Sequence, residues 1–232
     1  MEIHDLIGYA DWFIRAAAAV LAGVCGATML ERRSDDAGKL MGWMALVLML
    51  GGAGELLFRV LGAGPLGRSA GLMFWTLALT VFCVLLVLVW EKLCGTKQGF
   101  YSEMLLRHFS GIRALGCIAP FVVRLAYAMQ GESTDILSGA PPAAGFIAPG
   151  IRCLGLAVAA GVGVRLYRKT VGQIRALDKA WLWLLGAAAL EIASELGAVV
   201  IPALEMLHLA ALVCLSGLLL SFVRFSGEEN GD

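Results

Sequence analysis

The chain has 232 residues, of which 59% are hydrophobic and 16% are charged, and its mean hydropathy is +0.82. A soluble domain is nearer to about a quarter charged, so this composition argues against one. The formal net charge is zero, which argues against a nucleic-acid partner. Several apolar stretches of about 20 residues, the length that crosses a bilayer, predict an all-α, polytopic membrane protein in contact with membrane lipid.

Seven transmembrane helices are expected in chain order. The acidic start, Met1 to Asp5, lacks the basic region of a cleavable signal peptide, so the first helix is expected to be retained. The last two spans are separated only by a short segment around Pro202, where the alternative is one long kinked helix. About 45 apolar residues are too many for a single crossing, which favours two spans. The expected spans are 8–30, 39–62, 68–91, 107–129, 146–167, 179–201 and 203–224.

The positions of the basic residues predict the orientation of the chain. All five lysines fall in loops after the first, third and fifth spans, whereas the segment 131–149 has no lysine or arginine. Arg59 and Arg68, near the loop after the second span, are outnumbered. Because basic loops stay in the cytoplasm, the N-terminus is expected outside and the C-terminus inside a bacterial-type plasma (inner) membrane.

The first half of the chain recurs in the second half, displaced by about 140 residues. Ile14-Arg15 and Ile151-Arg152 open similar apolar runs. We interpret 1–92 and 146–225 as two parallel three-helix repeats of a single transmembrane domain, joined by a linker helix at 107–129. In the next helix, six residues align with no gaps: Lys39, Trp43, Leu50, Ala53, Glu55 and Leu56 with Lys179, Trp183, Leu190, Ala193, Glu195 and Leu196.

This three-plus-one-plus-three plan resembles the group of seven-helix proteins that includes the SWEET sugar transporters, the PQ-loop transporters, the PnuC vitamin transporters and the microbial rhodopsins. The resemblance covers nearly the whole chain and is architectural; it implies a small-molecule site between the two triplets. The chain has no Pro-Gln dipeptide, so the PQ-loop signature is missing. The last span, 204–224, has no lysine that could bind retinal, which argues against a retinal cofactor.

Ionisable side chains inside the spans are the main functional signal. Such a group costs roughly 2.5–3.5 kcal/mol at the bilayer centre on insertion scales, so each is expected to face the bundle or water. With a rise of about 1.5 Å per residue, the whole set falls in the outer half of the membrane. The candidate ligand-binding residues are Arg15, Glu55, Arg59, Trp75, Arg124, Arg152, Glu191, Glu195, Glu205 and His208.

Purely structural roles remain open for many of these residues, because charged side chains near helix ends often anchor a span or pair with one another. The alternatives are a surface ion pair of Asp11 with Arg15, outward snorkelling of Arg59 while it pairs with Glu55, a salt bridge from Arg124 to Glu191 or Glu195, an interfacial anchor at Arg152, and packing roles for His208 and Trp75.

Other chemistries have less support. His4, His108 and His208 lie far apart in depth, so no shared haem or zinc site, and no cofactor, is expected. The six cysteines form no Cys-x-x-Cys pair and are interpreted as small buried residues. No hydrolase or ATPase motif is present. An intramembrane enzyme would have to use Glu191, Glu195 and His208, and this is the third hypothesis.

The preferred hypothesis is an integral membrane transporter of a small polar or zwitterionic solute. The acids and arginines at one depth predict a cavity that is open to the outside and roughly balanced in sign. Glu195, with Glu191 one turn away, is the candidate for proton coupling. The alternative is a seven-helix sensor that binds an external ligand and signals through a cytoplasmic partner. The identity of the solute, and whether the chain forms a homo-oligomer, are left open.

Overall fold

The computed structural model describes residues 3–61, 65–94, 147–172 and 175–228, together with four single positions between 101 and 122. Within these residues the chain is helical and has no strand. The elements are α1 (Ile3–Arg32), α2 (Asp36–Leu61), α3 (Pro65–Cys94), α6 (Ile147–Thr170), α7 (Arg175–Gly197), the 3-10 helix η3 (Pro202–Met206) and α8 (Leu207–Glu228).

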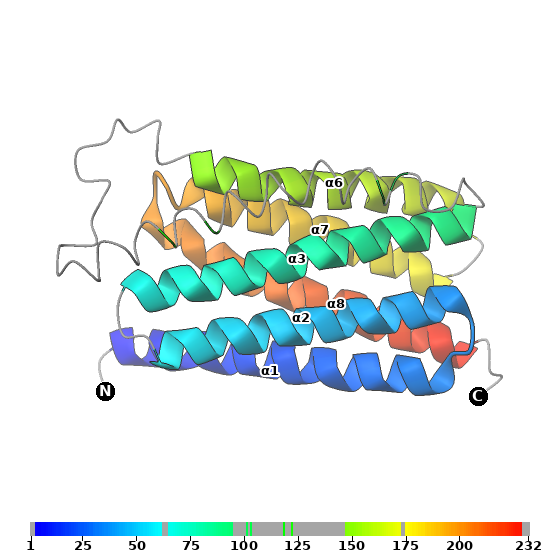
Figure 1. Ribbon diagram of the computed structural model, residues 1–232, viewed down its shortest axis with the longest axis horizontal. Helices are drawn as coiled ribbons and strands as arrows, with labels where there is room; N and C mark the ends of the chain where they lie inside the picture. Colours follow the sequence, from blue (N-terminus) through cyan, green and yellow to red (C-terminus); the bar gives the residue numbers. More distant parts are fainter. Residues whose placement is uncertain are drawn as a thin grey trace.

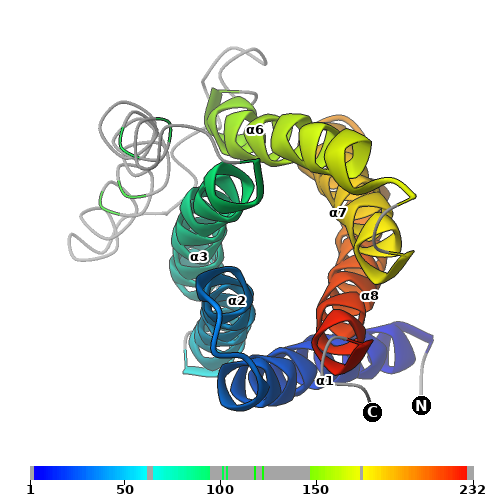
Figure 2. The same ribbon diagram turned by 90° about the vertical axis from the view of Figure 1, so that its right-hand side faces the viewer.

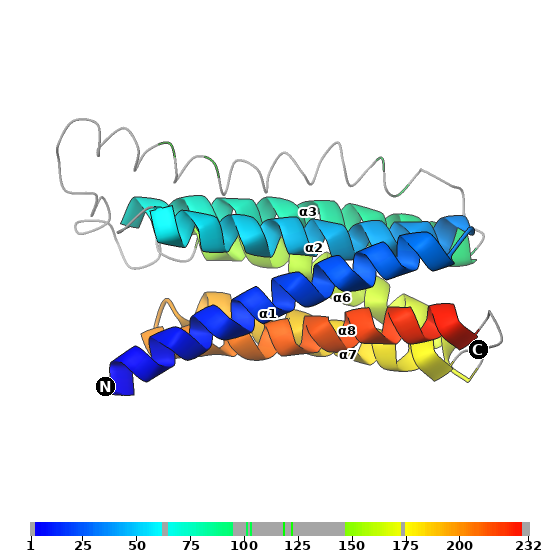
Figure 3. The same ribbon diagram turned by 90° about the horizontal axis from the view of Figure 1, so that it is seen from below.

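The six long helices form a ring when the bundle is viewed along its length (Figure 2). Each contacts the next in the order α1, α2, α3, α6, α7 and α8, and α8 closes the ring against α1. α1 is tilted, so that it lies beside α8 near its start and beside α2 near its end (Figure 3). The chain begins at one end of the bundle and finishes at the other (Figure 1). We call these the N-terminal end and the C-terminal end.

Five of the described helices are long and apolar enough to cross a membrane. They are the helical segments Tyr9–Arg32, Asp36–Phe58, Ala70–Cys94, Leu177–Gly197 and Leu207–Phe225. An all-helical architecture with five such segments is that of a multi-pass membrane protein, because a helix satisfies its own backbone hydrogen bonds in lipid.

The helix boundaries agree with six of the seven expected spans to within a few residues. The expected span 107–129 lies outside the described residues, apart from Ile118 and Val122. α6 corresponds to the expected span 146–167, and it is not among the five segments found within the described residues.

The turns between the helices follow from specific side chains. Asp35 accepts a hydrogen bond from the backbone N–H of Gly38, at 3.0 Å, and so caps the start of α2. After α6, Gly172 has a φ of 76°, a left-handed conformation that glycine adopts without strain. The backbone N–H of Gly172 donates to Asp178 of α7, at 3.0 Å. Both turns are therefore stabilised by side chains that lie close to them in the sequence.

α7 and α8 are separate helices, so the alternative of one long kinked helix is wrong. The backbone N–H groups of Val200 and Ile201 both bond to the carbonyl of Gly197, at 3.0 and 2.8 Å, which ends α7 in a tight turn. Pro202 then begins η3; it lacks an N–H and cannot continue the preceding helix.

The interior of the ring is filled by large apolar side chains. Trp181, Phe82 and Phe222 are the largest fully buried side chains of the described residues. α1 and α2 approach closely where Gly26 faces Gly42: a Cβ at Gly26 would lie 3.0 Å from the Gly42 carbonyl oxygen. Small residues at such crossings let membrane helices come together, since packing rather than the hydrophobic effect holds them in lipid.

Candidate functional site

Arg15 links α1 to α2 near the N-terminal end of the bundle. Its Nε donates to Asp11, one turn earlier on α1, at 2.8 Å, and its Nη1 donates to Glu55 on α2, at 2.7 Å. Arg15 and Glu55 are only 5% and 3% exposed. Asp11 and Arg15 therefore do not form the surface ion pair considered as an alternative, because the guanidinium is buried between two helices.

Arg152 links α6 to α7 in the same way. Its Nε donates to Glu195 at 3.0 Å, and its Nη2 forms a second, short contact with the other carboxylate oxygen. The two side chains are 17% and 15% exposed, so this pair is less buried than the first. Arg152 and Glu195 are the residues that align with Arg15 and Glu55 in the repeat expected from the sequence. Two aligned arginines thus contact two aligned glutamates.

Glu191 lies at the centre of a third group, which joins α3, α7 and α8. The indole N–H of Trp75 donates to Glu191 at 3.1 Å. Nδ1 of His208 lies 2.9 and 2.7 Å from the two carboxylate oxygens of Glu191. The rings of Trp75 and His208 meet edge to face, with their centroids 5.7 Å apart. All three side chains are buried, so the carboxylate is held by donors in place of water.

The second ring nitrogen of His208, Nε2, is not involved in the contact with Glu191. Nε2 is buried and has no hydrogen-bond partner among the residues that the structure describes. Buried polar atoms are almost always paired with protein or with ordered water, and an exception calls for an explanation. A packing role for His208 explains the contact of Nδ1 with Glu191, but it does not explain why Nε2 has no hydrogen-bond partner among the described residues.

Two small cavities flank Trp75, and each has room for about one water molecule. The first lies among α1, α2, α3 and α8 and is lined by Arg15 and Glu55 beside apolar side chains. The second lies among α3, α6, α7 and α8 and includes Glu191 in its lining. Trp75 and Leu215 line both. The described charges thus pair with one another beside two mainly apolar cavities, whereas the sequence suggested one cavity lined by charge.

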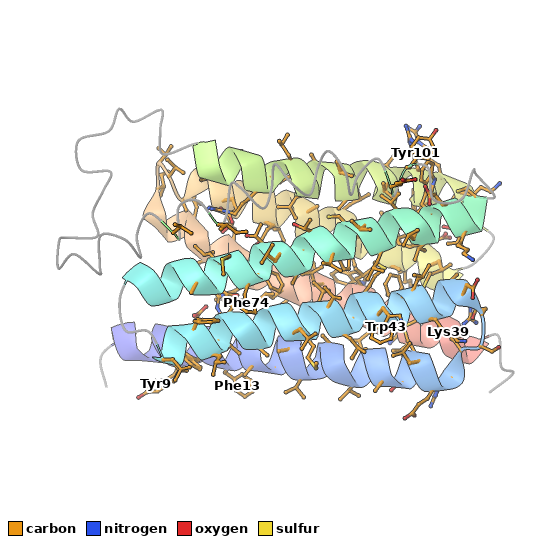
Figure 4. All side chains as sticks on the ribbon, in the orientation of Figure 1. Tyr9, Phe13, Lys39, Trp43, Phe74 and Tyr101 are labelled. Carbon is orange, nitrogen blue, oxygen red and sulfur yellow. The ribbon has the colours of Figure 1, made fainter. Side chains whose placement is uncertain are left out.

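The charged groups lie toward the N-terminal end. Tyr9 and Phe13, which flank Asp11, are near that end, whereas Lys39 and Trp43 are toward the other (Figure 4). Tyr9 and Phe13 are also highly exposed and point away from the bundle. Exposed aromatic side chains at this level suit a lipid-facing surface near an interface.

Three candidate residues are not placed by the structure. Arg124 lies outside the described residues, and the side chains of Arg59 and Glu205 are also outside the described part, although their backbones belong to α2 and η3. The salt bridges considered for Arg124 would use Glu191 or Glu195. The described partners of these two carboxylates are Trp75, His208 and Arg152.

Sequence reasoning missed the partnerships across the bundle. Trp75 was a candidate by its position, but nothing in the sequence connected it with Glu191, 116 residues away. Asp11 is not among the candidate residues, although its carboxylate accepts a hydrogen bond from Nε of Arg15. The signal for Asp11 was available, because a spacing of four residues places the two side chains together on α1.

Comparisons with protein-family models, curated proteins and solved structures find no match to this chain. The described residues are those of a helical, multi-pass membrane protein with paired charges inside its helix bundle.

Proposed function

We propose that this protein is a seven-span transporter of a small polar or zwitterionic solute. The observation that carries the proposal is the matched arrangement of two ion pairs, Arg15 with Glu55 and Arg152 with Glu195, between the first two helices of each triplet. Ionisable groups inside membrane spans are costly, and they mark substrate, ion and proton pathways in many membrane proteins. A matched pair of such groups is what a duplicated carrier would place around a shared solute route.

The order of helices round the ring supports two parallel repeats. If α1, α2 and α3 are matched in order with α6, α7 and α8, each contact within the first triplet has a counterpart within the second. The α3–α6 contact between the triplets likewise has a counterpart in the α8–α1 contact. The two cavities correspond in the same way. Ala22 and Leu48 line the first cavity, and the residues that align with them, Ala159 and Ala188, line the second. α3 ends at the C-terminal end and α6 starts at the N-terminal end, which suits one further crossing between them (Figure 1).

In this proposal, the solute binds beside Trp75, where the two small cavities widen as the triplets rock against each other along the α1–α8 and α3–α6 contacts. The ion pairs keep the first two helices of each triplet together while these contacts open. A carboxylate and a guanidinium at one level also match the two charges of a zwitterion.

We further propose that the C-terminal end of the bundle faces the cytoplasm. α1, α3 and α6 all end there with basic residues in their last turns. A cysteine introduced at position 138, in a segment free of lysine and arginine, is therefore expected to react with a membrane-impermeant maleimide added to intact cells. A cysteine at position 173 is expected to react only after lysis. Both changes, Ser138→Cys and Gln173→Cys, are made after the native cysteines have been replaced. The reversed pattern contradicts the orientation.

The transport proposal is tested in proteoliposomes. Radiolabelled amino acids, nucleosides and sugars are screened for accumulation, and protein-free vesicles are the control. For a solute that accumulates, Arg152→Lys and Glu195→Gln are expected to reduce uptake tenfold or more, because each keeps the size of the side chain but removes the two-bond contact. Uptake unchanged in both variants contradicts the role of this pair. Binding of a ligand without any flux points to the sensor instead.

A further inference from the structure

We propose that protons drive this transporter, and that Glu191 is the carboxylate that takes up the proton. The inference deepens the proposed function by naming the coupling ion. The protonation of Glu191 is argued from the described side chains alone, whereas its coupling to solute movement rests on the proposed function.

Glu191 differs from the two glutamates of the ion pairs in the kind of partner that it has. Glu55 of α2 contacts Arg15 of α1 at 2.7 Å, and Glu195 of α7 contacts Arg152 of α6 at 3.0 Å. An arginine is always charged, so each of these carboxylates has a permanent cation beside it. The described residues place no lysine or arginine in contact with Glu191, whose partners are the indole of α3 and the imidazole of α8. Glu191 can therefore gain a proton without breaking an ion pair with an arginine.

The proton is assigned to Glu191 and not to His208. Nδ1 of His208 already faces Glu191 at 2.7 Å, so an imidazolium would carry its second N–H on Nε2. Nε2 is buried and has no hydrogen-bond partner among the described residues. A buried, charged donor without an acceptor loses its hydration with nothing in exchange. Glu191, in contrast, lines the second cavity, which has room for about one water molecule, so a proton can reach the carboxylate through water.

Trp75 links the proton site to the movement of the triplets. It belongs to α3 in the first triplet and Glu191 belongs to α7 in the second, so their hydrogen bond of 3.1 Å joins the two triplets. A hydrogen bond to an ionised carboxylate is charge-assisted and roughly twice as strong as one between neutral groups. Protonation of Glu191 therefore weakens the link, and the triplets separate more easily. The carboxylate takes up one proton from the acidic side of the membrane and releases it to the other side, after which the link forms again.

Infrared difference spectroscopy of the full chain in detergent tests the protonation step. Lowering the pH is expected to produce the C=O stretching band of a protonated carboxyl group, which shifts to lower frequency in D₂O. This band is expected to be lost in Glu191→Gln. It is expected to remain in Glu195→Gln, the matched control one helical turn away, whose carboxylate contacts Arg152. A difference spectrum that is the same in Glu191→Gln as in the unaltered protein overturns the proposal.

The indole N–H resonance of Trp75 tests the link between the triplets, in protein labelled with ¹⁵N-tryptophan. Trp75→Phe identifies the resonance by removing it. The signal is expected to move upfield as the pH is lowered, because the hydrogen bond weakens, and to stay at its acidic position at every pH in Glu191→Gln. Trp181 is the internal control, since its indole donates to the uncharged hydroxyl of Thr170 at 3.1 Å and its signal is expected to stay in place.

A Trp75 resonance that does not respond to pH overturns the proposal. This measurement uses the unaltered protein, so it decides the question even if Glu191→Gln does not fold.

Transport measurements distinguish this inference from the transport proposal. For a solute that accumulates in proteoliposomes, an outside-acidic proton gradient is expected to raise uptake tenfold or more, and this increase is expected to vanish in Glu191→Gln. Uptake that does not respond to the gradient overturns the inference and leaves transport standing. A pH-dependent Trp75 resonance in a protein that moves no solute supports the proton site and contradicts transport.

Discussion

Replacing Glu55 by alanine is expected to lower the free energy of unfolding by about 3–5 kcal/mol, the usual cost of leaving one charge of a buried pair uncompensated. The change removes the carboxylate from Nη1 of Arg15, a guanidinium that is 95% buried between α1 and α2. Asp11 remains as a partner for Nε, so the protein is expected to fold but with lower stability. Thermal and denaturant unfolding in detergent, followed by circular dichroism, measures the loss.

The aligned pair supplies the control for this prediction. Glu195→Ala removes an equivalent carboxylate from Arg152, but that pair is more exposed and the freed guanidinium can reach water. A smaller loss is therefore expected, about 1–2 kcal/mol, the range of a hydrogen bond to a charged group. The double change Arg15→Met with Glu55→Leu is expected to recover part of the loss, because apolar side chains of similar volume often replace buried ion pairs without cost. An equal loss in Glu55→Ala and Glu195→Ala contradicts the assignment of burial.

The sequence predicted which residues are charged inside the bundle, but it could not assign their partners. A spacing of four residues correctly brings Asp11 and Arg15 together on α1. The same rule pairs Glu55 with Arg59 and cannot find the contact between Arg15 and Glu55, which depends on how α1 and α2 are rotated against each other. In a soluble protein the apolar face of a helix would indicate this rotation, whereas these helices are apolar all round.

Helix positions were easier to predict than contacts, since they depend on local composition. Long apolar runs and the charges between them located six helices to within a few residues. The contact of Trp75 with Glu191 depends on the closure of the ring, which places α3 across from α7 and α8, and no local pattern in the sequence encodes this arrangement. Glu195 was expected to carry protons on the basis of its neighbour Glu191, but it lies against Arg152 while Glu191 lies against His208. Although the two carboxylates are only one helical turn apart on α7, Glu195 contacts α6 and Glu191 contacts α8.

The α3–α6 contact gives the second large effect, on transport. Sγ of Cys83 on α3 lies 3.4 Å from the carbonyl oxygen of Gly155 on α6, so the two helices pass close together here. The Gly155→Cys variant places a second thiol at this contact, and we expect it to form a disulfide with Cys83 on oxidation. If the triplets rock along this contact, the cross-link locks them together. Oxidation with copper phenanthroline is expected to reduce uptake at least tenfold, and dithiothreitol is expected to restore it. The other native cysteines are replaced beforehand.

The matched control carries Gly155→Cys together with Cys83→Ala, and cannot form the bond. Its uptake is expected to be unaffected by the oxidant, which separates the cross-link from any effect of the new side chain. Mass spectrometry of the non-reduced protein verifies that the disulfide has formed. Full uptake by a protein that is completely cross-linked would mean that α3 and α6 do not separate during transport. The α3–α6 contact and the α8–α1 contact are the two places where the triplets meet, and they correspond to each other in the proposed repeat. That result would therefore also rule out rocking of the triplets as the way in which the cavities gain access to the two sides of the membrane.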